Sequence, residues 1–326
     1  MTRIGILVVA YNAASTLHTV LDRIPAHFRP KIERILVSDD ASDDATYLVG
    51  LGYQQVNDEL PLTVIRQPTN LGYGGNQKAG YRWSIEHDLD IVVLLHGDGQ
   101  YAPEMLPEMV APLERGEADA VFGSRMLDPG EARRGGMPRY KYLGNRVLTR
   151  FENAMLGSDL SEWHSGYRAY SVDALRRIPF DRNSDGFDFD TQVIVQLLEA
   201  DMRIEEIPIP TYYGDEICHV NGIPYALSCL KSILTSKANR VHLLYDPRFD
   251  LAGAGEAYQF KEAPNSLHQH IVARRLEAGS RVVDLGAGTA RVGRSLHQRG
   301  ARVVAVDQHR PPEDPGIPYL ERDLDG

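Results

Sequence analysis

The fold is decided by the stretch Ile91-Val92-Val93-Leu94-Leu95-His96-Gly97-Asp98-Gly99-Gln100. Its first five residues are apolar and rich in β-branched side chains, which predicts a strand that is buried on both faces. The strand runs directly into polar side chains at alternate positions, His96, Asp98 and Gln100. Because ligands of open α/β sheets gather at the carboxyl ends of the strands, these side chains are candidates for metal or phosphate chemistry. Taken alone, the segment fits a polar turn after a core strand equally well.

Three similar strands precede this one along the chain. Apolar runs at residues 4–9, 35–37 and 62–65 predict these strands, and residues 14–24 and the segment from Asn76 to His87 are typical of helices. Alternation of strands and helices at this spacing predicts a doubly wound α/β sheet. Its ligand crevice would lie across the strand ends.

Polar and glycine-rich loops follow two of the predicted strands. Asp39 and Asp40 end the second strand, where a carboxylate can accept hydrogen bonds from the base or ribose of a nucleotide. Ser42 is a candidate N-cap of the following helix. After the third strand, the segment Asn70-Leu71-Gly72-Tyr73-Gly74-Gly75-Asn76 allows a ligand to approach the backbone closely, with a helix N-terminus facing its phosphate. A solvated helix start and ordinary turn glycines remain the alternatives.

Composition narrows the class of protein. The net charge of -10 over 326 residues argues against a general nucleic-acid binder, which needs a basic surface. The two cysteines, Cys218 and Cys229, provide no disulfide framework and fit a reducing cytoplasm. No apolar run approaches the roughly 20 residues that span a bilayer, so any membrane contact is expected to be peripheral.

Several motifs occur in an order that matches one family. They are Ala10-Tyr11-Asn12, the acidic run from Asp39 to Thr46, Asn70-Leu71-Gly72 with Gly75, Gly97-Asp98-Gly99-Gln100, Gly123-Ser124-Arg125, the segment from Ser165 to Ser171 and the segment from Gly186 to Gln192. Over roughly residues 1–240 the chain resembles family 2 glycosyltransferases of the GT-A fold, and most of all the dolichyl- or polyprenyl-phosphate sugar transferases. The resemblance implies an α/β, Rossmann-like, doubly wound mixed sheet. It also implies an inverting enzyme that moves a sugar from GDP-mannose or a UDP-sugar to a polyprenyl phosphate, in glycan or cell-envelope biosynthesis.

The resemblance assigns a divalent cation, Mn²⁺ or Mg²⁺, to His96, Asp98 and Gln100. It assigns the nucleoside-diphosphate sugar to a larger set, namely Ala10, Tyr11, Asn12, Asp39, Asp40, Asn70, Gly72, Gly75 and Asp98. His96 stands where the family commonly has aspartate. Because imidazole binds Mn²⁺ and later metals more readily than Mg²⁺, the sequence predicts a preference for Mn²⁺.

Acceptor binding is expected from cations near the predicted site. Residues 130–146 are basic and glycine-rich, and arginine grips phosphate in a bidentate manner. By the resemblance, the acceptor phosphate is held by Arg125, Arg139 and Arg168, with Arg146 as a weaker candidate. The residues assigned to catalysis are Asp98, Arg125, Asp188 and Asp190. The last two are expected to position groups, because an acceptor phosphate is already anionic and needs no strong base.

An amphipathic basic segment at residues 223–245 could meet a membrane or pack on its own domain, and its apolar and basic residues fit both. With a lipid acceptor, the enzyme is expected in the cytoplasm, peripheral at the inner face of the membrane. Three alternatives are a nucleotidyl transferase, a non-catalytic sugar-nucleotide scaffold, and a fragment of a glycosyltransferase/methyltransferase that acts on a non-lipid acceptor. The first would need a glycine-rich basic segment after the first strand, which Ala10-Tyr11-Asn12-Ala13 lacks.

A second motif follows a predicted linker at residues 246–262, which separates a domain at 1–245 from one at 263–326. Residues 281–290 predict a strand and a glycine-rich turn, and residues 302–307 predict a second strand. This part resembles the N-terminal portion of class I S-adenosylmethionine-dependent methyltransferases. The resemblance assigns the cofactor to Asp284, Gly286, Gly288, Asp307 and Asp323. We expect S-adenosylmethionine to bind only if a longer chain completes the module, and methyl transfer by these residues is not expected.

Overall fold

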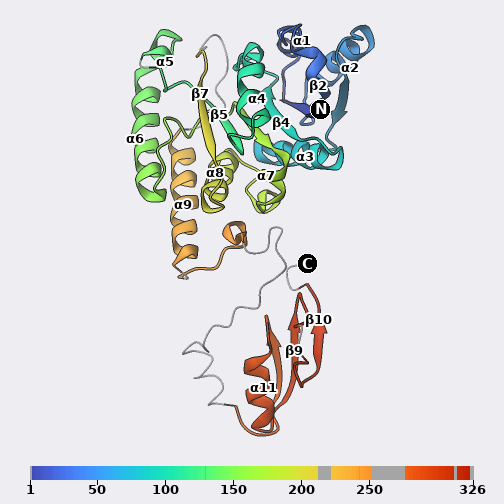
Figure 1. The fold of residues 1–326 in the computed structure, drawn as a ribbon, viewed down its shortest axis with the longest axis vertical. Coiled ribbons are helices and arrows are strands. Elements are labelled where there is room, and N and C mark those ends of the chain that lie inside the picture. Colours follow the sequence, from blue (N-terminus) through green and yellow to red (C-terminus); the bar gives the residue numbers. More distant parts are fainter. Residues whose placement is uncertain are drawn as a thin grey trace. The chain divides into compact units, whose positions relative to one another are not determined.

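The structure is a computed structural model that describes residues 2–128, 130–211, 222–241, 243–251, 276–311 and 314–323. Contacts divide the chain into two compact units, Met1–Ala254 and Gly255–Gly326 (Figure 1). Within the described ranges, no helix combines the length and the apolar character needed to cross a membrane.

The first unit is built around a seven-stranded sheet with the strand order β3-β2-β1-β4-β6-β5-β7. The strands are β1 (Ile4–Ala10), β2 (Ile32–Asp39), β3 (Leu62–Arg66), β4 (Ile91–His96), β5 (Ala120–Ser124), β6 (Arg168–Ser171) and β7 (Ile204–Pro208). Strand β6 is antiparallel to β4 and β5, and the other neighbours are parallel. The expected α/β mixed sheet is therefore confirmed.

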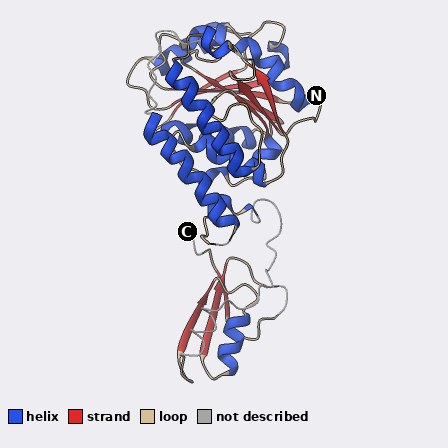
Figure 2. Cartoon of the chain, turned by 90° about the vertical axis from the view of Figure 1, so that its left-hand side faces the viewer, coloured by secondary structure: helices blue, strands red, loops and turns tan. Residues whose placement is uncertain are grey.

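Helices cover both faces of this sheet (Figure 2). The longer ones are α1 (Leu17–Asp22), α2 (Thr46–Val56), α3 (Gly72–Glu86), α4 (Leu106–Glu114), α6 (Arg139–Leu156), α8 (Phe189–Glu199) and α9 (Gly222–Arg240), and the shorter ones are α5 (Glu131–Arg134) and α7 (Val172–Arg176). Helices α1 and α4 pack in one core, while α3, α7 and α8 pack in the other. Strand β4 supplies alternate residues to both cores, and residues 91–95 are each 3% exposed or less. The prediction of a strand buried on both faces is confirmed.

Two helix starts differ from the sequence-based expectation. Helix α2 begins at Thr46, and Ser42 lies outside it, with its hydroxyl hydrogen bonded to the carboxylate of Asp39. Ser42 is therefore not an N-cap, because its hydroxyl is used within the preceding loop. Helix α3 begins at Gly72, so the glycine-rich segment forms its first turn instead of a loop before it.

The first unit extends past the expected domain boundary at residue 245. A 3-10 turn, Pro247–Phe249, follows α9, and the ring of Phe249 is 3% exposed within the core that contains α8. The carbonyl of Arg248 accepts a hydrogen bond from Gln196 Nε2 at 2.7 Å. Residues 246–251 therefore belong to the first unit and not to a linker. The rest of the predicted linker lies outside the described residues.

The second unit contains a parallel sheet with the order β10-β9-β8 and one described helix. Its elements are β8 (Arg281–Leu285), α11 (Arg291–Gln298), β9 (Arg302–Asp307) and β10 (Tyr319–Glu321). The carboxylate of Asp307 accepts a hydrogen bond from Gly288 N at 2.8 Å, and that of Asp284 accepts one from Gly293 N at 3.0 Å. The carboxylates of these two predicted cofactor residues thus bind their own glycine-rich turn and helix, and nothing in the described residues of the unit assigns a cofactor to them.

Candidate active site

The loops that carry the predicted motifs start from neighbouring strands at one edge of the sheet. In the register of the sheet, Ala10 lies beside Asp39, and Val9 lies beside His96. Two further hydrogen bonds extend the pairing into the loops, from Asp40 N to Ala10 O at 2.9 Å and from Gly97 N to Val9 O at 2.8 Å. The sheet therefore places the ends of β1, β2 and β4 side by side, as their sequences predict.

Hydrogen bonds connect the loop after β1 to the loop after β2. Asn12 has a left-handed φ of 52°, its backbone N–H donates to Ser42 Oγ at 2.9 Å, and its Oδ1 accepts from Asp43 N at 3.0 Å. Asp39 is fully buried and lies 3.5 Å from Arg66 Nε. Tyr11, by contrast, is 44% exposed. The ring of Tyr11 is thus open to a ligand, whereas Asn12 and Asp39 also have structural partners.

Asp40 anchors the glycine-rich turn at the start of α3. Its carboxylate accepts hydrogen bonds from Leu71 N at 2.7 Å and Gly72 N at 3.0 Å. Burial raises the pKa of the Asp40 carboxyl, and these two backbone hydrogen bonds partly offset the shift. The donor-binding role of Asp40 stays a prediction.

The glycines of this turn have a packing role. A Cβ on Gly72, whose φ is +80°, would lie 2.8 Å from the carbonyl oxygen of Asp185, and one on Gly74 would lie 2.5 Å from that of Ser184. The Asp185 carbonyl also accepts from Gly74 N at 2.8 Å and Gly75 N at 3.4 Å. Protein acceptors therefore occupy the backbone N–H groups that could have faced a phosphate. The assignments of Asn70, Gly72 and Gly75 to the sugar nucleotide stay predictions.

Of the predicted metal ligands, Asp98 lies on the surface, whereas the Nε2 atom of His96 is buried. Asp98 is exposed, and its Oδ1 accepts a hydrogen bond from Gln100 N at 2.9 Å in the turn after β4. The imidazole of His96 instead packs edge-on against the rings of Tyr73 and Tyr101, with centroids 5.7 Å and 4.9 Å away. Burial lowers the pKa of His96, although the nearby carboxylates of Asp98 and Asp190 oppose the shift. The neutral imidazole is therefore favoured.

A polar cluster lies beneath this turn. Asp190 accepts a hydrogen bond from the Tyr73 hydroxyl at 2.8 Å and lies 3.8 Å from Arg168 Nε. A Cβ on Gly166 would lie 2.9 Å from both the Tyr73 hydroxyl and His96 Cε1, so only glycine fits here. Among the described residues, His96 Nε2 and Asp190 Oδ1 are buried without a hydrogen-bond partner. Tyr73 is not among the predicted site residues, although an aromatic residue inside a glycine-rich motif is a signal that could have marked it.

The predicted acceptor arginines differ in their surroundings. Arg125 forms a buried pair with Glu162, whose carboxylate accepts from Arg125 N at 2.8 Å and Nε at 3.0 Å. Burial alone would raise the pKa of Glu162, but the Arg125 guanidinium lowers it below its ordinary value. The partner of Arg125 cannot be predicted from the sequence, because no local pattern links residues so far apart in the chain.

Arg168 and Arg139 lie in opposite environments. The Arg168 side chain is 1% exposed and donates to the carbonyls of Ser165 at 3.0 Å and Trp163 at 2.8 Å. This position argues against the predicted contact with an acceptor phosphate, because the guanidinium is enclosed by protein. Arg139 is exposed at the first turn of α6 and has no ion pair or hydrogen bond with other described residues. Asp188, at the start of α8, accepts from Gln192 Nε2 at 2.8 Å.

The strand order, with acidic and glycine-rich loops collected at one edge, defines a GT-A-like sugar-nucleotide fold. A family model, glycosyl transferase family 2, matches residues 5–178. The chain therefore belongs to glycosyltransferase family 2, and it is a glycosyltransferase. A glycosyltransferase of this family is neither a nucleotidyl transferase nor a non-catalytic sugar-nucleotide scaffold, two of the alternatives that the sequence left open.

Three named relatives are sugar transferases that act on lipid phosphates. The undecaprenyl-phosphate mannosyltransferase of Micrococcus luteus is 30% identical over 64% of this chain and 82% of its own. A UDP-N-acetylglucosamine–dolichyl-phosphate N-acetylglucosaminyltransferase of Methanococcus voltae is 26% identical over 65% and 86%. The polyprenol monophosphomannose synthase of Mycolicibacterium smegmatis is 26% identical over 63% and 75%.

Solved structures support the fold. Glucosyl-3-phosphoglycerate synthase from Mycobacterium tuberculosis, in complex with Mg²⁺ and UDP, has a TM-score of 0.55 at 20% identity, covering 72% of this chain and 78% of its own. The same enzyme with Mn²⁺, UDP-glucose and phosphoglyceric acid has a TM-score of 0.54 at 20% identity, covering 72% and 79%. At this identity the likeness extends to the fold alone.

Proposed function

We propose that the protein transfers a sugar from a nucleoside-diphosphate sugar to a polyprenyl phosphate at the cytoplasmic face of a membrane. The observation that carries the lipid acceptor is an exposed apolar stripe on α6, a helix that starts in the basic segment after β5. The stripe consists of Tyr140, Leu143, Val147 and Phe151, which are 74%, 64%, 61% and 39% exposed. Its spacing of three or four residues places these side chains on one face of the helix.

Helix α9 also carries exposed apolar side chains. It packs against α6 (Figure 1), and Ile223, Leu227 and Leu234 on it are 76%, 61% and 54% exposed. Exposed cations accompany the apolar side chains on α6, including Arg139, Arg146 and Arg150. Apolar side chains flanked by cations suit an anionic membrane surface, which supports the peripheral contact predicted for residues 223–245.

Asp98 and Gln100 fit a divalent cation that is shared with the donor diphosphate. Mg²⁺ and Mn²⁺ sites of this kind commonly use one or two carboxylates and complete their coordination with water and phosphate oxygens. The exposed Asp98 carboxylate suits such a site, and His96 offers a buried Nε2 without a described partner. When bound, the cation neutralises the charge that develops on the departing diphosphate. In this proposal His96, Asp98 and Gln100 hold the cation, and Tyr11, Asp39 and Asp40 shape the nucleoside pocket.

The reaction breaks the bond between the anomeric carbon and the donor diphosphate, and an acceptor phosphate oxygen forms the new bond from the opposite face. The acceptor oxygen is anionic near neutral pH, so no strong general base is required. Arg139, exposed and without a described partner, is the arginine best suited to meet the phosphate. Arg125, already paired with Glu162, acts in this proposal as a positioning residue. Asp188 and Asp190 orient neighbouring groups at the start of α8.

The test measures transfer of labelled sugar into a lipid extract. The full chain, Mn²⁺ and polyprenyl phosphate are incubated with GDP-mannose and with several UDP-sugars in parallel. We expect label in the lipid fraction with at least one donor. Asp98→Asn should lower the rate about 100-fold or more, because the developing diphosphate charge loses several kcal/mol of stabilisation.

The matched control is Asp58→Asn, which removes an exposed carboxylate from the loop before β3. This variant should keep the parental rate. A folded protein that moves no label from any donor would contradict the lipid acceptor. Undiminished transfer by Asp98→Asn would contradict the assignment of the cation.

A further inference from the structure

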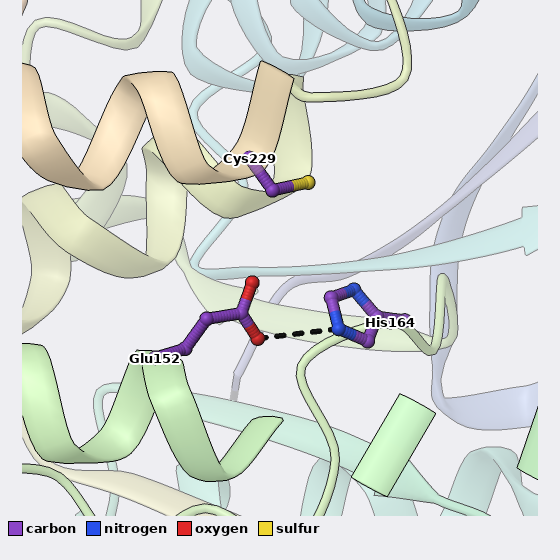
Figure 3. A group of neighbouring side chains, drawn as sticks. All are labelled: Glu152, His164 and Cys229. Carbon is purple, nitrogen blue, oxygen red and sulfur yellow. Dashed lines mark ion pairs between the residues drawn. The ribbon is translucent and has the colours of Figure 1, made fainter. Parts of the chain in front are cut away.

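A second group of metal-binding side chains lies inside the first unit, formed by residues other than the predicted donor and cation ligands. It consists of Glu152 on α6, His164 in the segment before β6, and Cys229 on α9 (Figure 3). One ligand atom from each residue lies within 4.8 Å of the other two. Two neighbouring segments and the distant helix α9 thus direct a carboxylate, an imidazole and a thiol toward one point.

In the part of the chain that the structure describes, no group donates a hydrogen bond to the carboxylate of this cluster. Glu152 is fully buried, and among the described residues neither of its oxygens has a hydrogen-bond partner. Its one close cationic neighbour in that part of the chain is His164, whose Nε2 lies 3.2 Å from Oε2 and also lacks a hydrogen bond. A buried carboxylate without donors is costly, so a positive charge is required beside it. A protonated His164 or a metal ion would supply that charge.

The thiol distinguishes these two solutions. An ion pair between Glu152 and His164 does not require a thiol nearby, whereas Zn²⁺ binds carboxylate, imidazole and thiolate ligands together. Hard cations such as Mg²⁺ prefer all-oxygen sites. We propose that Glu152, His164 and Cys229 bind a structural Zn²⁺ ion that joins α6, α9 and the segment before β6.

Further contacts orient two of the ligands. His164 Nδ1 lies 2.9 Å from the Tyr225 hydroxyl, so Nδ1 can donate there and leave Nε2 to the metal. Cys229 Sγ accepts a hydrogen bond from Thr191 Oγ1 at 3.2 Å. Burial raises the pKa of the Cys229 thiol to about 12, so the metal-free residue is protonated and metal binding releases a proton.

The proposed site also supports the acceptor region. The carbonyl of His164 accepts a hydrogen bond from Arg125 Nη2 at 3.1 Å, and two neighbouring carbonyls in the same segment accept from Arg168. A metal ion on the His164 ring would therefore fix the backbone that holds both arginines. Binding of Zn²⁺ by these three residues does not depend on which donor and acceptor the enzyme uses.

The test uses Co²⁺ as a spectroscopic substitute for Zn²⁺ in the full chain. Cys218, which lies outside the described residues, is first changed to serine, so Cys229 is the chain's one remaining cysteine. After chelation and removal of the chelator, one equivalent of Co²⁺ should give the near-ultraviolet absorption of a thiolate–cobalt bond. Zn²⁺ should displace the Co²⁺ and abolish that absorption.

Cys229→Ser in the same background should abolish the absorption and raise the Kd for Zn²⁺ about 100-fold or more, since even outer contacts of metal sites are worth 10–100-fold. Glu152→Gln should weaken Zn²⁺ binding in the same direction. His87→Asn and Asp98→Asn are the controls and should leave the spectrum unchanged.

Two results would overturn the proposal. The folded parent could show no thiolate absorption at stoichiometric Co²⁺, which would leave Glu152 and His164 as a buried ion pair. The absorption could also persist in Cys229→Ser. The first result needs no substitution in the cluster, so a failure of variants to fold does not affect it.

Discussion

His96 is the last residue of β4 and directly precedes the loop that carries the exposed Asp98. Its ring is nevertheless enclosed by Tyr73, Tyr101 and Gly166. Its backbone position follows from β4, but the direction of its ring follows from packing. An aspartate here would place a second anion beside Asp98, whereas the neutral imidazole leaves the site less negative. The identity of this residue should therefore affect the choice of metal.

We predict that the enzyme prefers Mn²⁺ to Mg²⁺ at limiting metal concentrations and that His96→Asp shifts the preference toward Mg²⁺. An anionic oxygen suits the harder cation, and imidazole suits Mn²⁺. Initial transfer rates and calorimetric titration of each metal in the presence of UDP or GDP would measure the shift. Equal activity and equal binding with both metals in the parent would count against His96 as a ligand.

The buried pair of Arg125 and Glu162 gives a pH-dependent prediction. Glu162→Gln should lower the free energy of unfolding by about 3–5 kcal/mol at pH 7, because Arg125 would stay buried without its counter-charge. The pKa of Glu162 is lowered from an ordinary value of 4.5, so the pair stabilises fully above that value. The stabilisation is lost as the pH falls through the lowered pKa.

Denaturant unfolding of the parent and the variant between pH 7 and pH 3 would follow this loss. The difference in unfolding free energy should shrink toward acid pH. A Glu117→Gln variant, which removes an exposed carboxylate, is the control and should change stability little at any pH. A difference that is constant across the range would contradict the ionic origin of the effect.

At the scale of elements, α6 and α9 carry apolar side chains on their exposed faces. The sequence predicts that residues 223–245 are amphipathic. In the structure, some of their apolar side chains are buried and others are exposed. Ile233 is fully buried in a hydrophobic core of the first unit, whereas Leu227 and Leu234 are 61% and 54% exposed. The same segment thus packs on its own domain and leaves other apolar side chains exposed to solvent.

We predict that Leu143→Gln combined with Val147→Gln reduces binding to anionic vesicles roughly tenfold, since each substitution removes part of the apolar area buried in the lipid. Sedimentation with vesicles that contain phosphatidylglycerol would measure it, and high salt should weaken binding of the parent. The matched control is Leu48→Gln with Val56→Gln on α2, which are 67% and 83% exposed. Equal loss in both double variants would argue against α6 as the contact surface.

At the scale of the molecule, the division into two units gives a test by truncation. A chain that ends at residue 254 should keep its transfer rate and its main thermal transition, because the predicted donor and acceptor residues lie in the first unit. A chain that ends at residue 245 should lose about 1.5–3 kcal/mol or more of stability, since it lacks the buried Phe249. Activity assays and thermal unfolding of both chains would measure these effects. If the chain that ends at 254 were inactive, the second unit would contribute to the reaction.

Local sequence patterns predict the first strands of the sheet and the loops that follow them. Runs of β-branched residues predict β1 to β4, and the acidic and glycine-rich motifs at their ends predict one edge of the sheet as the site. Residues in one strand and its following loop are close in the sequence, so periodicity is enough to place them. Helix starts are less well predicted, because Gly72 begins α3 only with the help of Asp40 and Asp185.

The sequence by itself determined the family, the doubly wound sheet and the collection of polar loops at one edge of that sheet. Only the tertiary structure decided which charged side chains face a ligand and which face the protein. It paired Arg125 with Glu162, enclosed Arg168, exposed Arg139, and brought Glu152, His164 and Cys229 together. These outcomes depend on contacts between segments far apart in the chain, which no local pattern of residues encodes.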